Sequence, residues 1–104
     1  MNVLAAEGGF TPLHGAGHFS QYTCIQVLLD RGAVLEAIDN MHRTALHFAA
    51  SSGSKECTLI LLQAGAVVDK VDIDGNTPLA LAIENENREC IDVLQVLQLR
   101  SNAS

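Results

Sequence analysis

The sequence predicts an all-α repeat solenoid, a row of similar helical units stacked side by side, and three observations support this fold class. The 104-residue chain matches itself when shifted by 33 residues, giving three copies at one fixed period. Each copy contains a Thr-x-Leu segment suited to the start of a helix, and glycine follows the second helical segment in two copies. The coinciding positions are Thr11, Thr44 and Thr77; Leu13, Leu46 and Leu79; Ala16, Ala49 and Ala82; Cys24, Cys57 and Cys90; and Leu28, Leu61 and Leu94.

The first helix of each unit is expected to start at the recurring threonine. A threonine side chain at the N-cap accepts a hydrogen bond from a backbone N–H that has no partner within the helix. Pro12 and Pro78 come next, at the first helical position, where proline loses no hydrogen bond. In the middle copy the helix covers "ALHFAASS" and stops at Gly53, which suits a left-handed helix end. The small Ala49 and Ala50 let a neighbouring helix approach closely.

A second helix is expected over "KECTLILLQA" of the middle copy, with apolar residues at helical spacing and Gly65 at its end. In the last copy, the equivalent helix has extra apolar residues at Val96 and Leu99. Such a helix meets a further repeat, meets a partner, or leaves an exposed apolar end. The residues of this helix that can face the core are Cys90, Ile91, Val93, Leu94 and Leu97.

This pattern resembles the ankyrin repeat family, whose marks are the period of 33, the Thr-Pro-Leu-His start and the Gly-Ala after the second helix. The resemblance covers about residues 7–99. It implies ankyrin-type helix–turn–helix units with β-hairpin-like fingers, and a concave face of fingers and first helices that binds other proteins. We therefore expect a single domain over residues 1–104, with repeats at about 7–39, 40–72 and 73–104 and atypical terminal repeats.

The copies depart from the family pattern at several positions. Gly15 and Gly17 weaken the first helix of copy one, each by about 1 kcal/mol relative to alanine. Ser20 and Glu86 stand where a glycine stop is expected, and His42 stands at the glycine position of a finger. The first and third copies carry most of these departures, as terminal repeats do.

Composition and charge exclude several functions. The net charge is −6 and the six basic residues are scattered, so we expect no nucleic-acid binding and no binding to anionic membranes. No apolar stretch approaches the ~20 residues that span a bilayer. The N-terminus has no basic region ahead of an apolar run, so it does not resemble a signal peptide. We expect an intracellular protein, cytoplasmic or nuclear.

The residues that could carry chemistry are better explained as structural. The three equivalent cysteines are expected on the inner side of the second helices, as small buried apolar residues rather than a disulfide or metal set. His14 and His18 share a helix face, but no glutamate or third ligand accompanies them. The resemblance assigns His14 and His47 hydrogen bonds near the helix start. We therefore expect no catalytic residue, no metal and no cofactor, and a protein that is not an enzyme.

The segment "DIDGN" (72–76) is similar to part of a calcium-binding loop. A frame that starts at Asp72 places Ile83 where the bidentate glutamate belongs, and a frame that starts at Lys70 places Leu81 there. A finger turn with Gly75 at positive φ is the better interpretation.

Positions in the fingers and at the ends of the first helices are not expected to serve the stack, which leaves them available to a partner. Several are apolar, and aromatic residues and methionine are enriched in the cores of interfaces. Single exposed apolar residues are also normal, and each one could instead pack on the neighbouring finger. The predicted partner-binding residues are Phe10, His18, Phe19, Ile38, Asn40, Met41, Arg43, Ser51, Ser52, Val71, Ile73, Asp74, Asn76, Glu84 and Asn85.

The charge near the C-terminal copy points to the kind of partner. The stretch from Asp69 to Asp92 contains seven acidic residues and two basic ones, Lys70 and Arg88, which leaves five net negative charges. We predict a basic or neutral partner segment with apolar anchors; a solvated acidic end that only aids solubility is the alternative. The predicted function is a non-enzymatic scaffold or adaptor module. Alternatives are an accessory targeting or inhibitory domain of a larger enzyme or regulator, and a structural spacer. We expect a monomer, with self-association through Val96–Leu99 as an alternative.

Overall fold

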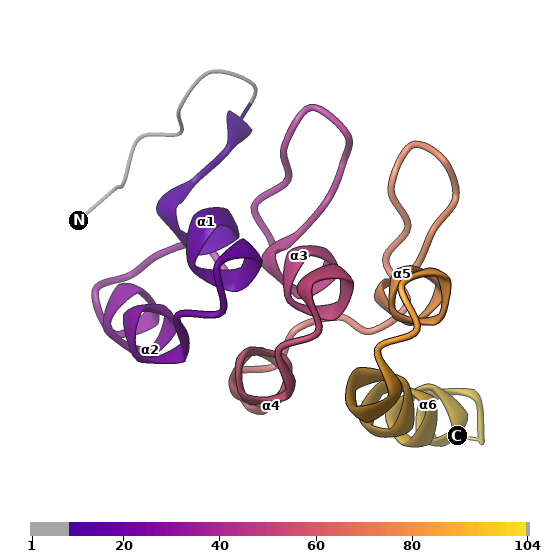
Figure 1. Ribbon diagram of the computed structural model, residues 1–104. Coiled ribbons are helices and arrows are strands. Elements are labelled where there is room, and N and C mark those ends of the chain that lie inside the picture. The colour runs from indigo at the N-terminus through magenta and orange to yellow at the C-terminus, as the bar shows by residue number, and fades with distance from the viewer. Residues whose placement is uncertain (1–8, 104) are drawn as a thin grey trace.

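The computed structural model describes residues 9–103, with side chains up to residue 97. Within this part of the chain six helices form three consecutive pairs that stack side by side (Figure 1). The first helices, α1, α3 and α5, make one row, and the second helices, α2, α4 and α6, make the other. Their bounds are Pro12–His18 (α1), Tyr22–Asp30 (α2), Ala45–Ser52 (α3), Lys55–Gln63 (α4), Pro78–Glu84 (α5) and Arg88–Ala103 (α6). This arrangement confirms the all-α repeat fold.

The fingers are the loops that lead into α3 and α5 and project away from the helices (Figure 1). We call residues 37–43 finger A and residues 70–76 finger B. The expected β-hairpin character is limited, because no strand is assigned within residues 9–103. Each loop is nevertheless closed by a backbone hydrogen bond between its two arms, from Asp39 N to Arg43 O at 3.1 Å and from Asp72 N to Asn76 O at 3.0 Å.

The helix ends follow the sequence signals. Thr11, Thr44 and Thr77 each accept a hydrogen bond from the backbone N–H three residues later, which confirms the predicted N-caps. Gly53 ends α3 in the left-handed region at φ 84°. Ser20 and Glu86, its equivalents in the other pairs, take the same conformation at φ 59° and 57°. The backbone of the repeat thus imposes this conformation even where a side chain makes it cost about 1 kcal/mol.

Small residues hold the first helices close together. Ala49, Ala50 and Ala82 are fully buried in the core that runs through all three pairs. A Cβ added at Gly17 would lie 2.9 Å from the carbonyl oxygen of Ala45, so α1 meets α3 without room for a side chain there. Glycine at this position weakens the helix but permits the contact.

The prediction that all three equivalent cysteines are buried is wrong for Cys24. Cys57 and Cys90 are fully buried, whereas Cys24 is exposed. The reason is position: the Sγ of Cys57 lies 4.0 Å from Ala16 O, so the preceding helix pair covers it. Within the described residues no pair covers Cys24 in this way. Burial raises the pKa of the Cys57 and Cys90 thiols, because it disfavours the thiolate.

A matched pair of substitutions measures the contribution of stacking. Leu46 is 1% exposed between two neighbouring pairs, whereas its equivalent Leu79 is only partly buried. We expect Leu46→Ala to lower the free energy of unfolding by about 3 kcal/mol, and Leu79→Ala to lower it by less. Urea unfolding followed by circular dichroism checks the difference. Equal losses of unfolding free energy in the two variants would mean that coverage by a following helix pair adds little stability.

Candidate functional site

The predicted partner-binding residues come from two kinds of element. Fingers A and B carry residues on their arms and tips, and the ends of α1, α3 and α5 carry the rest. We call these residues together the finger surface. Finger A supplies Ile38, Asn40, Met41 and Arg43; finger B supplies Val71, Ile73, Asp74 and Asn76; the helix ends supply His18, Phe19, Ser51, Ser52, Glu84 and Asn85; and Phe10 precedes α1.

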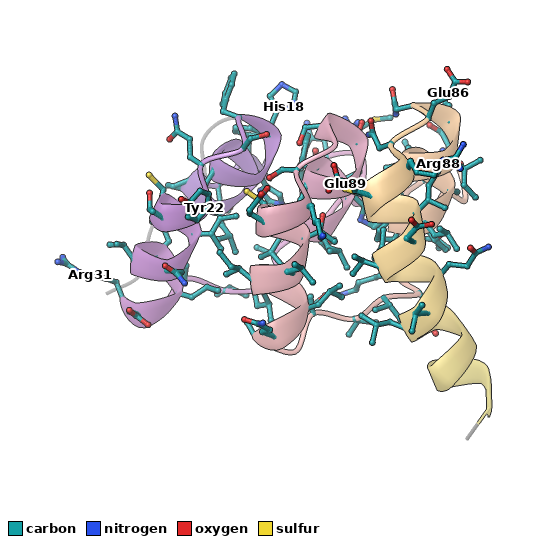
Figure 2. The ribbon with its side chains drawn as sticks, turned by 60° about the horizontal axis from the view of Figure 1, so that its bottom comes forward. His18, Tyr22, Arg31, Glu86, Arg88 and Glu89 are labelled. Atoms are coloured by element: carbon teal, nitrogen blue, oxygen red, sulfur yellow. The ribbon has the colours of Figure 1, made fainter. Side chains whose placement is uncertain are left out.

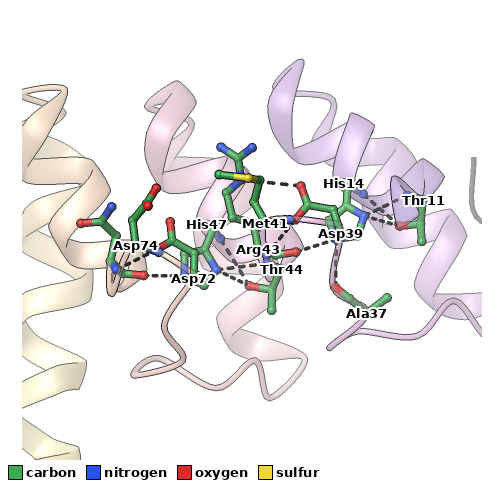
Figure 3. Close-up of polar contacts among 11 residues, drawn as sticks. Thr11, His14, Ala37, Asp39, Met41, Arg43, Thr44, His47, Asp72 and Asp74 are labelled. Atoms are coloured by element: carbon green, nitrogen blue, oxygen red, sulfur yellow. Dashed lines mark hydrogen bonds and ion pairs between the residues drawn. The ribbon is translucent and has the colours of Figure 1, made fainter. Parts of the chain in front are cut away.

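A buried or half-buried aspartate folds each finger. The Oδ1 atom of Asp39 accepts hydrogen bonds from the backbone N–H groups of Met41 and Arg43, both at 2.9 Å (Figure 3). Asp72 does the same for Asp74 at 2.9 Å and Asn76 at 2.8 Å. This confirms that "DIDGN" is a finger turn, with the carboxylate of Asp72 occupied by backbone donors.

The fingers are also joined to each other. The backbone N–H of Ile73 donates to the carbonyl oxygen of Met41 at 3.0 Å, which links the tip of finger B to finger A. Ahead of the fingers, Glu36 accepts from the backbone N–H of Val67 at 3.0 Å and lies 3.5 Å from the Nζ of Lys70. The two fingers therefore present their side chains on one connected frame.

Two histidines attach the helices to the fingers. The Nδ1 atom of His47 accepts from the backbone N–H of Thr44 at 3.0 Å, so the neutral ring carries its proton on Nε2 and donates it to Asn76 O at 3.0 Å. His14 repeats this geometry with Thr11 N at 2.9 Å, and its Nε2 lies within 3.0 Å of both Ala37 O and Arg43 O (Figure 3). The structural role predicted for both histidines is confirmed.

An aromatic cluster lies between α1, α3 and the chain ahead of α1. The rings of Phe10 and His14 stack at 5.7 Å between centroids, and both meet the edge of Phe48, at 5.5 and 5.4 Å. His18 lies 5.8 Å from Phe48 and 4.7 Å from Phe19. The sequence interpretation missed Phe48. Its spacing of three and four residues from Ser51 and Ser52, on the same helix, was the available signal.

Arg43 is fixed against this cluster. Its guanidinium carbon lies 5.0 Å from the centre of the Phe48 ring, a distance typical of a cation–π contact. Its Nε lies 3.6 Å from the Oδ2 of Asp39, which makes an ion pair longer than a hydrogen bond. The side chain is half-buried and held in one direction.

The expectation that finger-surface positions do not serve the stack is wrong for several residues. Phe10 and Arg43 pack on Phe48, as described above. Ser52 donates to Gly17 O at 3.1 Å, between neighbouring pairs. Asn85 donates to Leu81 O at 2.8 Å and lies 3.4 Å from the Ser51 hydroxyl. The side chains of Ser52 and Asn85 thus donate to backbone carbonyls near the ends of first helices, where carbonyls lack partners within the helix.

The remaining finger-surface residues divide by exposure. Met41, Ser51 and Asn76 are half-buried. His18, Phe19, Ile38, Asn40, Val71, Ile73, Asp74 and Glu84 are exposed. Phe19 is 67% exposed and Ile73 is 56% exposed. Apart from His18, whose ring lies 5.8 Å from that of Phe48, these exposed residues are the ones that a partner could contact without disturbing the stack.

Where the structure describes the chain, no group of three or more His, Cys, Asp and Glu residues is placed to hold a metal ion. Both ring nitrogens of His14 are engaged by the helix start and finger A. None of the described helices combines the length and apolar character needed to cross a membrane.

Comparison with known families adds an independent finding. A family model described as ankyrin repeats in three copies matches residues 34–102, and a model of the single ankyrin repeat matches residues 8–40. No curated protein matches the chain.

The environment of His47 makes stability depend on pH. Burial lowers the pKa of its imidazole, because removal from water disfavours the charged ring. The carbonyl of Asn76 and the carboxylate of Asp72 oppose this effect more weakly. A proton on Nδ1 would also remove the acceptor that Thr44 N–H uses.

Acidification is therefore expected to destabilise the fold. The unfolded chain takes up a proton on His47 near pH 6.5 while the folded ring resists it, so the free energy of unfolding falls as the pH drops below this value. One proton limits the slope to about 1.4 kcal/mol per pH unit. Urea unfolding between about pH 7.5 and 5.5 checks it, with His47→Gln as the comparison. A slope unchanged in that variant would assign the pH dependence to other groups.

Proposed function

The chain belongs to the ankyrin repeat family, and we propose that it acts as a scaffold or adaptor that binds a segment of another protein on its finger surface. Ankyrin repeats are protein–protein interaction modules, and their domains are typically non-catalytic. The observation that carries the proposal is the set of exposed apolar side chains on fingers whose backbones are fixed. Ile38, Val71 and Ile73 stand on loops closed by Asp39 and Asp72.

Fixed loops favour binding for an energetic reason. Binding costs less free energy when the loops that meet the partner need no ordering, because their backbone entropy was already lost on folding. Apolar residues on such loops gain free energy when a partner removes their surface from water. The finger surface therefore combines ordered backbone with apolar contact area.

The charges of the described residues refine the kind of partner. Asp72 is occupied by finger B, so it contributes little to a ligand. Asp74 and Glu84 are exposed beside the apolar residues of finger B and α5. Arg43 is already paired with Asp39. The third pair therefore offers negative charge to a ligand, which supports a basic or neutral segment with apolar anchors.

The alternative of self-association rests on the end of α6. Val96 is 53% exposed, while Leu99 lies outside the residues whose side chains the structure describes. One exposed valine is ordinary for a protein surface. The finger surface is better supported, because several exposed apolar residues gather there.

Capture from cell extract tests the binding surface. We expect the double variant Met41→Asp and Ile73→Asp to lose the proteins that the parent chain captures, because two charges would be placed in the apolar contact. Their backbone hydrogen bond is kept, since it joins Met41 O to Ile73 N. A charge control is Val34→Asp with Val96→Asp, which adds the same charge on exposed residues outside the fingers, and circular dichroism of both variants checks that the half-buried Met41 position still allows folding. Unchanged capture by the finger variant, or loss in the control alone, would move the site elsewhere.

Salt dependence tests the charge of the partner. With a captured protein in hand, we expect its Kd to rise by about tenfold between roughly 0.05 and 0.5 M salt, because exposed charges are screened. The variant Asp74→Asn with Glu84→Gln should weaken binding at low salt and flatten this dependence. Isothermal titration of both proteins measures it. A Kd independent of salt would remove the electrostatic part of the proposal.

A further inference from the structure

The two ends of the stack differ, as a comparison of residues 33 positions apart reveals. On the side of the first pair, residues are exposed whose equivalents are buried: Pro12 against Ala45 and Pro78, and Cys24 against Cys57 and Cys90. Leu28 is half-buried where Leu61 and Leu94 are buried. We call Pro12, Gln21, Cys24 and Leu28 the front face. Figure 2 shows this end of the stack, with Tyr22 at the start of α2 and Arg31 directly after its end.

The opposite end shows the reverse pattern. Residues there are partly or largely exposed where their equivalents in the middle pair are buried against the third pair. We call these residues, Leu79, Ala80, Ile83 and Ile91, the back face. Their equivalents in the middle pair are Leu46, His47, Ala50 and Thr58.

The front face keeps the chemistry of an internal contact between pairs. Inside the stack, a cysteine packs against the first helix of the preceding pair, as Cys57 does on Ala16. The side-chain amide of Asn87 donates to Ala50 O at 2.7 Å and Ser51 O at 2.9 Å at the end of α3. Cys24 and Gln21 hold the equivalent positions, so the front face offers a small thiol and an amide donor in the same places.

The back face has lost that chemistry. Ile83 stands where Gly17 and Ala50 let the next first helix approach, and it is 52% exposed. At Gly17 even a Cβ would come within 2.9 Å of the next helix, so an isoleucine in this position prevents the same approach. Ala80 replaces the histidine whose ring reaches the next finger, as His47 reaches Asn76 O.

We propose that the front face is a docking surface for one further ankyrin-type helix pair, placed ahead of α1 as a repeat of the same array. The back face excludes such a pair in the register of the stack. The front face continues the contact that already joins the three pairs, and this continuity identifies the occupant. The docking pair needs glycine or alanine at the position of Ala50 and histidine at that of His47. A second copy of this chain does not qualify, because its back face presents Ile83 and Ala80. The proposal does not depend on what the finger surface binds.

A duplicated helix pair of this chain can serve as the docking pair, and the thiol of Cys24 reports whether the front face is covered. In the first variant, a second copy of residues 43–75 is inserted between Gly9 and Phe10, which keeps Phe10 beside His14 and Phe48, with Cys57→Ser in the inserted copy. The front face then meets the residues that the middle pair presents to the third. We expect the urea midpoint and the denaturant slope to rise, because more surface is buried cooperatively. Labelling of Cys24 by a thiol reagent should slow by about tenfold or more, because a buried thiol reacts only when the structure opens locally.

A second variant tests the back face. Residues 65–97 are repeated after residue 97, which places an added pair against Ile83 and Ala80. We expect no rise in the urea midpoint. The same variant with Ile83→Ala and Ala80→His in the original third pair should regain the rise, because the small residue and the ring restore the internal contact.

The outcomes are decisive in each direction. The proposal would be overturned if labelling of Cys24 were unchanged in the first variant. It would also be overturned if the second variant, without Ile83→Ala and Ala80→His, were stabilised as much as the first. Labelling of the parent chain is also followed as its concentration rises, alongside sedimentation velocity. Protection of Cys24 with formation of a dimer would show that a second copy covers the front face, which also overturns the proposal.

Discussion

The hydrogen bond from a histidine ring to the next finger sets the position of each helix pair on its neighbour. His47 accepts from the start of its own helix and donates to Asn76 O, so one ring fixes a helix, a finger and the angle between them. His14 does the same one pair earlier. The close contact of α1 with α3 at Gly17 and the hydrogen bond between the two fingers lie at the same two junctions between pairs. A side chain that serves two neighbours at once tolerates few substitutions, because a lost bond leaves buried polar groups without partners.

Most of the fold followed from local signals in the sequence. Threonine caps, the prolines after them and the glycine ends each act within a few residues, so the period of 33 was enough to place the helices. Even the departures kept the backbone: Ser20, His42 and Glu86 adopt positive φ in place of glycine. The equivalent positions keep the same backbone conformation, so the helices could be placed correctly even where glycine is replaced.

The exposure of individual side chains was harder to predict. Equivalence suggested one environment for the three cysteines, yet Cys24 lies at an end of the stack and is exposed. The finger surface was similarly underdetermined, because Arg43 and Phe10 found partners on Phe48, a residue that the pattern assigned only to a helix. Both cases depend on what packs beside a residue in space. A repeat pattern specifies the unit, and the neighbours of each unit decide which of its residues remain available.

The stacking of pairs on their immediate neighbours has a mechanical consequence. The distance between Phe19 on the first pair and Asp74 on finger B is set by contacts in series, because each pair packs mainly on its immediate neighbours. Small rotations at successive contacts add, so they determine the curvature and twist of the row. Gly17 and Ala50 lie at two of these contacts, where neighbouring first helices meet closely. A bound segment that spans several pairs would fix these rotations. Its binding free energy would then include the free energy needed to bring the row to the bound curvature.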